Sequence, residues 1–261
     1  MDLSLRNRHA LVGGASRGIG RATAIELALN GASVTCIARN ESHLKAVVAG
    51  LDTSRNQIHQ YITGDASKPD VLAEKVSAIA ATQAVHILIN NTGGPPDGPA
   101  HTAGEPEYLA AFTQHVLCNQ AILQAVLPGM RASGYGRIIN IISTSVKQPI
   151  PGLGVSNTIR GAVASWAKTL ASELGPDGIT VNNVLPGFTE TDRLDEVIAA
   201  NAGRSGQTIE DTAASMRATV PLRRFGQAHE TAAAIAFLAS PAAAYINGIN
   251  LPVDGGRTAS L

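Results

Sequence analysis

The chain has 261 residues, a length that fits one large α/β domain. Lysine plus arginine and aspartate plus glutamate both number 20, so the formal net charge is +0 and no charge excess marks nucleic acid or a membrane surface as a partner. The hydrophobic fraction is 44% and the aromatic fraction only 3%, so small aliphatic side chains must fill the core.

Short apolar runs alternate with amphipathic stretches along the chain, which is the pattern of successive βα units and a parallel sheet. Strands are expected at residues 9–12, 33–38, 58–63, 85–90, 137–142, 179–184 and 249–253. Helices are expected from a glycine-rich turn to residue 30 and at 44–51, 69–81, 106–132 and 157–174, with Pro128 placed to kink the fourth.

One stretch, residues 192–219, is polar and helical in pattern and lies outside this alternation. We expect it to pass over one edge of the sheet as a substrate lid. No linker-like segment or internal repeat divides the rest, so residues 1–261 are expected to form a single nucleotide-binding domain.

The first strand enters the first helix through a glycine-rich turn with the sequence Gly14-Ala15-Ser16-Arg17-Gly18-Ile19-Gly20. Glycines at such a turn let the backbone approach a pyrophosphate, and the helix N-terminus stabilises its charge. A tight turn without a ligand is the plainer alternative. The flanking strand and helix favour a dinucleotide site.

The end of the second strand bears on which dinucleotide is bound. An NAD site usually carries an acidic residue there for the ribose 2′-hydroxyl, whereas this chain has Ala38-Arg39-Asn40, with Glu41 following. Arg17 and Arg39 together suit a 2′-phosphate by charge and by the fork geometry of the guanidinium. NADP(H) is therefore the predicted cofactor, with NAD(H) as the alternative and a solvated surface arginine as the plainer interpretation of Arg39.

Several further motifs follow in a fixed order. They are Asp65 after the third strand, Asn90-Asn91-Thr92-Gly93 after the fourth, Pro186-Gly187-Phe188-Thr189-Glu190-Thr191 after the sixth, Arg224-Phe225-Gly226, Phe237-Leu238-Ala239-Ser240 and Val253-Asp254-Gly255-Gly256. Over nearly its whole length the chain resembles the short-chain dehydrogenases/reductases, particularly 3-oxoacyl-(acyl-carrier-protein) reductase.

The resemblance implies a three-layer, doubly wound Rossmann fold with a mainly parallel seven-stranded sheet. It also implies cofactor contacts: Asp65 and Ala66 at the adenine, Asn91, Thr92 and Gly93 at the middle of the cofactor, and Pro186, Gly187 and Thr189 at the nicotinamide end. Asn, Gly and Pro are turn formers in any case, so turn formation is the plainer interpretation of each motif.

The family's catalytic pattern is broken in this chain. The family uses a Ser, a Tyr thirteen residues later and a Lys four residues after the Tyr. Counting from Ser143 leads to Ser156 and then to Arg160, and the family's upstream Asn falls on His115. None of the four tyrosines has a lysine four positions later.

These replacements change the expected chemistry. A serine hydroxyl is a poorer acid than a phenol, whose pKa is about 10, and arginine does not release its proton. In an active reductase, Arg160 would bind the nicotinamide ribose and polarise a carbonyl, and Ser143 and Ser156 would orient it. His115, with an ordinary pKa of about 6.5, would be the group able to exchange a proton near neutrality. A packing role for His115 is the alternative.

Three functions stay open at this point: an NADP(H)-dependent reductase of a small carbonyl or alcohol, with a 3-oxoacyl compound as one option; an NADP(H)-binding sensor or oligomer partner without activity; and a lyase or isomerase on the same scaffold. The lid carries mixed charges and no basic patch that marks an acyl carrier protein, so it does not identify the substrate. The family also implies a homotetramer built through the helices at 106–132 and 157–174 and the C-terminal segment.

The remaining expectations concern location. Residues 1–6 hold no apolar run that fits a signal peptide, and no segment reaches the ~18 apolar residues that a membrane span needs. Cys36 and Cys118 fall in a predicted strand and a predicted helix, which favours free thiols in a reducing compartment. A cytoplasmic protein without a metal site is expected.

Overall fold

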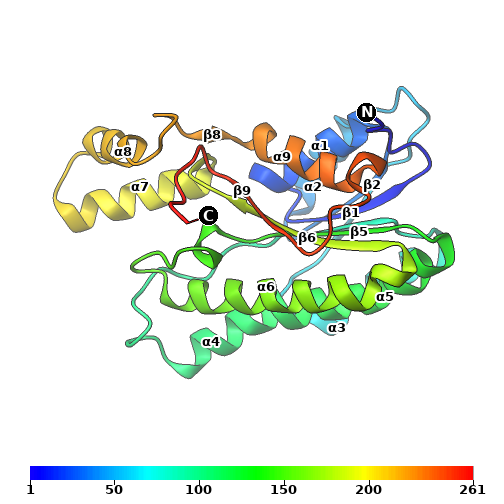
Figure 1. The fold of residues 1–261 in the computed structure, drawn as a ribbon, viewed down its shortest axis with the longest axis horizontal. Helices are drawn as coiled ribbons and strands as arrows, with labels where there is room; N and C mark the ends of the chain where they lie inside the picture. Colours follow the sequence, from blue (N-terminus) through cyan, green and yellow to red (C-terminus); the bar gives the residue numbers. More distant parts are fainter. Residues whose placement is uncertain (261) are drawn as a thin grey trace.

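A computed structural model describes residues 1–260, in which strands and helices alternate around a central parallel sheet (Figure 1). The seven strands are ordered β3-β2-β1-β4-β5-β6-β9, and every neighbouring pair is parallel. The strands are β1 (His9–Gly13), β2 (Ser33–Ala38), β3 (Gln60–Thr63), β4 (Ile87–Asn90), β5 (Gly136–Ile141), β6 (Ile179–Pro186) and β9 (Asn250–Val253). The predicted α/β class, seven-stranded sheet and doubly wound topology are confirmed.

Helices cover both faces of the sheet and bury it in two apolar cores. One face is covered by α1 (Gly18–Leu29), α2 (Glu41–Ala49) and α9 (Ala228–Ala239). The other is covered by α3 (Pro69–Thr82), α5 (Cys118–Ser133) and α6 (Gly154–Leu174). The strands are buried on both sides by aliphatic residues such as Leu11, Ile89 and Val181, which explains their continuous apolar runs. None of the described helices is long and apolar enough to cross a bilayer.

Four asparagines form a ladder across the neighbouring strands β4, β5, β6 and β9. The side-chain amide of Asn90 donates to Asn140, that of Asn140 to Asn183, and that of Asn183 to Asn250, each at 2.8 Å. These residues lie directly opposite one another in the strand register. Buried amides need partners, so the ladder fixes the relative register of the four strands.

The single helix expected at 106–132 is divided in the structure. It consists of α4 (Glu105–Phe112), a π-helical turn η1 (Thr113–Leu117) and α5. Pro128 lies inside α5, which continues past it to Ser133. The helix is therefore interrupted about four turns before Pro128, where the kink was expected. The interruption is a π-turn, a feature that often marks a functional site.

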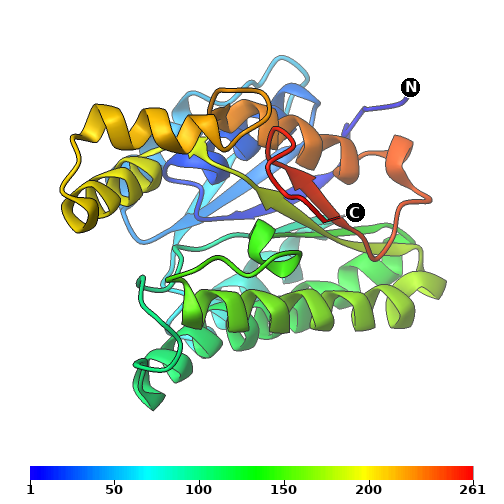
Figure 2. The same ribbon diagram turned by 60° about the vertical axis from the view of Figure 1, so that its left-hand side comes forward.

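The excursion at 192–219 forms two helices, α7 (Asp192–Ser205) and α8 (Ile209–Ala218), which project beyond the sheet at one end (Figures 1 and 2). They pack on each other through a small separate cluster that includes Leu194, Ile198 and Met216. A two-stranded ribbon of β7 (Thr189–Glu190) and β8 (Gly226–Gln227) closes the base of the excursion. It is thus an attached helical pair with its own small core.

Candidate functional site

A cavity of about 1380 Å³ opens at the carboxyl ends of the parallel strands, between them and α7. Its lining comes from the glycine-rich turn, the ends of β2, β4, β5 and β6, the start of α6 and the first part of α7. Ligand sites of open parallel sheets lie at this edge. Nearly all the predicted site residues line it, namely Gly14, Ser16, Arg17, Gly18, Ile19, Arg39, Asp65, Ala66, Asn91, Thr92, Gly93, Ser143, Ser156, Arg160, Pro186, Gly187 and Thr189.

The glycine-rich turn is shaped so that only glycine fits at its key positions. Gly14 and Gly18 have φ values of 59° and 55°, a region that side chains rarely adopt. A Cβ on Gly14 would lie 2.5 Å from Nδ2 of Asn91, and one on Gly20 would overlap the carbonyl oxygen of Gly14. Gly20 therefore packs beneath the turn and does not line the cavity, whereas Gly14 and Gly18 form its surface.

The N-terminus of α1 is open to an anion. Arg17 occupies the N-cap position but its side chain makes no capping hydrogen bond, and the first turn holds no acidic residue. Backbone N–H groups at a helix N-terminus bind phosphate when no side chain satisfies them. This end of α1, with the bare backbone at Gly14 and Gly18, fits the pyrophosphate of a dinucleotide.

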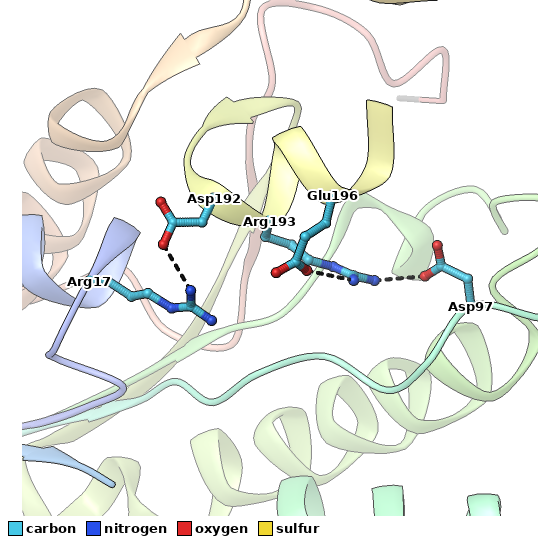
Figure 3. A network of polar contacts seen from close by, with 5 residues as sticks. All are labelled: Arg17, Asp97, Asp192, Arg193 and Glu196. Carbon is cyan, nitrogen blue, oxygen red and sulfur yellow. Dashed lines mark hydrogen bonds and ion pairs between the residues drawn. The ribbon is translucent and has the colours of Figure 1, made fainter. Parts of the chain in front are cut away.

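The two arginines predicted to read a 2′-phosphate have different surroundings. Arg17 forms an ion pair of 2.8 Å with Asp192, the first residue of α7 (Figure 3). Arg39 is exposed at the end of β2 and has no such partner among the described residues. The pKa of the Asp65 carboxyl lies below its usual value because the Ser67 N–H donates to it at 3.0 Å, and the nearby charge of Arg39 adds to this.

The turn after β6 is held against the loop after β9. The N–H of Gly187 donates to the Val253 carbonyl at 2.9 Å, and a Cβ on Gly187 would lie 2.7 Å from Cα of Asp254. The hydroxyl of Thr189 donates back to the Gly187 carbonyl at 3.2 Å. The turn expected at the nicotinamide end is therefore fixed by the last strand of the sheet.

Three of the four predicted catalytic residues share the floor of the cavity. Ser143 ends the segment after β5, and its Oγ accepts a hydrogen bond of 3.1 Å from the Ser145 N–H. Ser156 lies in the first turn of α6 and Arg160 one turn later. In the part of the chain that the structure describes, no tyrosine lines this cavity. Within the described residues, no phenol group therefore replaces the tyrosine that the family pattern expects at position 156.

Arg160 is a buried cation that has no counter-ion within residues 1–260. Only 8% of its surface is exposed, its Nη1 donates to the Ile141 carbonyl at 3.2 Å, and its Nε has no acceptor among the described residues. Burial lowers its pKa to about 10, so the side chain stays charged at neutral pH. A Cβ on Gly94 would lie 3.8 Å from its Nη2, so the charge faces the loop after β4.

His115 lies in the π-turn η1, beneath the cavity and outside its lining. It is 2% exposed and its Nε2 has no partner among the described residues. Burial, and then the charge of Arg160, lower its pKa to about 3, although a hydrogen bond with the Gly93 backbone acts in the opposite direction. The expectation that His115 exchanges protons near neutrality assumed an ordinary pKa, and the lowered pKa favours the alternative, a packing role for a neutral ring.

Several polar residues of the cavity were not among the predicted site residues. Arg193 of α7 pairs with Asp97 at 2.7 Å and with Glu196 at 3.2 Å, and so ties α7 to the loop after β4 (Figure 3). Asn119 of α5 and Arg257 after β9 also line the cavity. Arg257 directly follows the matched motif that ends at Gly256, and this adjacency was the one signal for it in the sequence.

Comparison with known proteins agrees with this geometry. Residues 14–258 match the family model described as enoyl-(acyl carrier protein) reductase. Short-chain reductase protein NovJ of Streptomyces niveus is 34% identical, covering 95% of this chain and 93% of its own length. The 3-oxoacyl-(acyl-carrier-protein) reductase FabG of Escherichia coli is 35% identical, with coverage of 97% and 98%.

The fold is also that of solved reductases. The crystal structure of L-sorbose reductase from Gluconobacter frateurii, complexed with NADPH and L-sorbose, superposes with a TM-score of 0.93 at 27% identity and covers 100% of both chains. With the glycine-rich turn, the sheet order and these matches in agreement, the chain belongs to the short-chain dehydrogenase/reductase family.

Proposed function

We propose that the protein is an NADP(H)-dependent oxidoreductase that interconverts a carbonyl and an alcohol, using Ser143, Ser156 and Arg160. The observation that carries this proposal is Arg160: a buried cation that lines the cavity and has no counter-ion in the described part of the chain. A buried charge that no protein group neutralises is suited to an anion that forms on the ligand.

The cofactor would be held by the elements already described. Gly14 to Gly18 and the open end of α1 fit the pyrophosphate, Arg17 and Arg39 suit a 2′-phosphate, and Asp65 with Ala66 lie where the adenine is expected. The middle and the nicotinamide end of the cofactor would be held by Asn91 to Gly93 and by the turn from Pro186 to Thr189. Bound there, the nicotinamide supplies or accepts a hydride.

Arg160 would stabilise the negative charge that develops on the substrate oxygen, since a fixed charge in a site that excludes water acts strongly there. Ser143 and Ser156 would donate hydrogen bonds to that oxygen. Neither Arg160 nor neutral His115 releases a proton at neutral pH. The proton that completes the alcohol therefore comes from water, passed on by a serine hydroxyl.

A second candidate function is NADP(H) binding without turnover. The observation that favours it is the loss of the family's acid: no described tyrosine lines the cavity, and the pKa of the nearby His115 is about 3. Binding needs only the turns, which are intact, whereas turnover needs a proton source.

Calorimetry with NADPH and NADH, followed by NADPH oxidation with a panel of ketones, aldehydes and 3-oxoacyl thioesters, decides between the two. We expect binding and turnover in the native protein, and loss of turnover with retained binding in Arg160→Gln. Binding without turnover on the whole panel would favour the second candidate. Absence of binding would exclude both.

We also propose that the protein works in the cytoplasm as a homotetramer. The buried free thiols of Cys36 and Cys118 suit a reducing compartment. Leu109, Phe112 and Leu117, near the predicted helix interface, are 57%, 39% and 46% exposed, and a second copy of the chain would cover them. Sedimentation analysis measures the assembly directly, and a monomer would refute it.

A further inference from the structure

Arg257 is a second cation in the cavity that the proposed reaction leaves unused. Its side chain is partly buried and lines the cavity, and its guanidinium carbon lies 4.2 Å from the centre of the Phe188 ring. Its Nε is buried and has no acceptor among residues 1–260. Stacking on Phe188 holds the plane of the guanidinium but leaves its donors free.

The neighbouring carboxylate of Asp254 does not form an ion pair with Arg257. Asp254 uses its oxygens on the backbone of its own loop, where Oδ1 accepts from the Gly256 N–H at 2.9 Å and Oδ2 from the Thr258 N–H at 2.7 Å. The described residues offer Arg257 no ion pair. Burial lowers the pKa of Arg257, and the charge of Asp254 only partly opposes this. Arg257 is thus desolvated in part without a compensating partner.

Two other arginines of the cavity are paired with carboxylates, and Arg204 of α7, which donates to Asn201, is exposed to solvent. Arg17 is paired with Asp192, and Arg193 with Asp97 and Glu196 (Figure 3). Because a partly buried charge is costly unless it is paired, an arginine left without a carboxylate in a ligand cavity is suited to a charge on the ligand.

The position of Arg257 indicates which part of the ligand it meets. Its loop is fixed to the turn after β6 by the hydrogen bond from Gly187 to Val253 and by the close packing of Gly187 on Asp254. Phe188, on which Arg257 stacks, belongs to the same turn. The guanidinium is therefore held beside the turn assigned to the nicotinamide, the reacting end of the cavity, where Leu194 and Val197 of α7 add apolar surface.

We propose that Arg257 binds an anionic group of the substrate, a carboxylate or a phosphate, so that the enzyme acts on a small anionic carbonyl compound. This rests on the proposed function and names the substrate class of the same site. The guanidinium donates two parallel hydrogen bonds to the anion, and the carbonyl of the same molecule lies toward Ser143, Ser156 and Arg160.

Matched substrates test the proposal. The carboxylate arm compares 2-, 3- and 4-oxopentanoate with their methyl esters, and the phosphate arm compares dihydroxyacetone phosphate with dihydroxyacetone. In the native enzyme we expect kcat/KM for the anionic member of at least one pair to exceed that of its neutral partner by about tenfold to a hundredfold. Whichever arm shows the preference identifies the anion. Equal values in every pair would overturn the proposal without any variant.

Variants of Arg257 test whether this residue causes the preference for the anionic substrate. Arg257→Gln should abolish the preference for the anion, whereas Arg257→Lys should retain part of it. Arg217→Gln is the matched control, because Arg217 stacks on Phe225 at 4.8 Å but does not line the cavity. An unchanged preference in Arg257→Gln would contradict the proposal.

Two binding measurements separate this inference from its alternatives. Arg257→Gln could instead weaken NADPH binding and lower the activity on neutral substrates as much as on anionic ones. In that case the anion is the pyrophosphate of the cofactor and the proposal fails. Calorimetry with pentanoate and inorganic phosphate on the NADP⁺-saturated protein needs no turnover. Binding that depends on Arg257 in a protein that reduces nothing would support the anion site while refuting the proposed function; no binding of either anion would refute the site.

Discussion

The spacing of the family motif predicts Ser156 and Arg160 at the positions of its tyrosine and lysine, and their placement one turn apart on the same helix could be predicted from this spacing. Both fall on the first two turns of a regular helix, α6, so counting residues is reliable there. The state of His115 could not be predicted, because its pKa of about 3 depends on burial and on Arg160, which come from other parts of the fold.

Restoring the family residues should restore the family's acid. We predict that Ser156→Tyr combined with Arg160→Lys raises kcat on a neutral ketone by roughly 10²–10⁴-fold, the usual contribution of a positioned general acid. The measurement is steady-state NADPH oxidation. Ser156→Phe with Arg160→Lys is the matched control, since it has the ring but no hydroxyl. An equal gain in this control would show that shape, and not the phenol, is responsible.

The choice of cofactor should depend on Arg39. Arg39→Gln removes an exposed cation next to the expected 2′-phosphate. We predict a loss of NADPH affinity of about tenfold or more with NADH affinity nearly unchanged, since a charge-assisted hydrogen bond is worth about 1.5–3 kcal/mol. Calorimetric Kd values measure this. Arg55→Gln, an exposed site outside the cavity, is the control, and equal losses for both cofactors would contradict the assignment.

At the scale of elements, apolar periodicity predicted the strands to within about two residues and most of the helices. It could not predict the π-turn at η1, because the apolar pattern continues through Thr113–Leu117 and the extra residue per turn leaves no signature in composition. The excursion at 192–219 was visible as a break in the alternation. Its salt bridges to the glycine-rich turn and to Asp97 could not be predicted from the sequence, since they join segments far apart in the chain.

The ion pair between Arg17 and Asp192 connects the start of α1 to α7. In the proposed cofactor site it would compete with a 2′-phosphate for the same guanidinium. We predict that Asp192→Asn tightens NADPH binding by about two- to fivefold and NADH binding less, because an exposed pair contributes only about 0–1 kcal/mol. Kd values at low and high salt measure the effect, which should shrink at high salt. Glu196→Gln, which leaves Arg17 paired, should not change the affinity for NADPH.

For the whole molecule, two buried histidines make stability depend on pH. The pKa of His9 is lowered to about 4 by burial and by His86, and that of His115 to about 3. Because the unfolded chain takes up these protons near pH 6.5 and the folded chain does not, stability is full above about pH 6.5 and falls as the pH drops toward the folded values. Acid should therefore destabilise the fold well before the carboxylates titrate.

We predict that the free energy of unfolding falls by about 2 kcal/mol per histidine between pH 7 and pH 5. Urea titrations at several pH values measure it. His115→Gln should remove the contribution of this histidine to the pH dependence of the unfolding free energy. His101→Gln, at an exposed position, should leave that pH dependence unchanged. A slope unaffected by His115→Gln would indicate that the imidazole is not held neutral by burial.

The pairing of β9 with β6 sets the order in which the site can be assembled during synthesis. β9 spans Asn250–Val253, pairs in parallel with β6, and carries the loop on which Gly187 rests. Until residues 250–257 have been made, β6 is an exposed edge, the asparagine ladder lacks its last member, and the turn at Pro186 has nothing to fix it. The glycine-rich turn rests on earlier strands, so we expect a nascent chain to form the half of the cavity around this turn first and the half around Pro186 last.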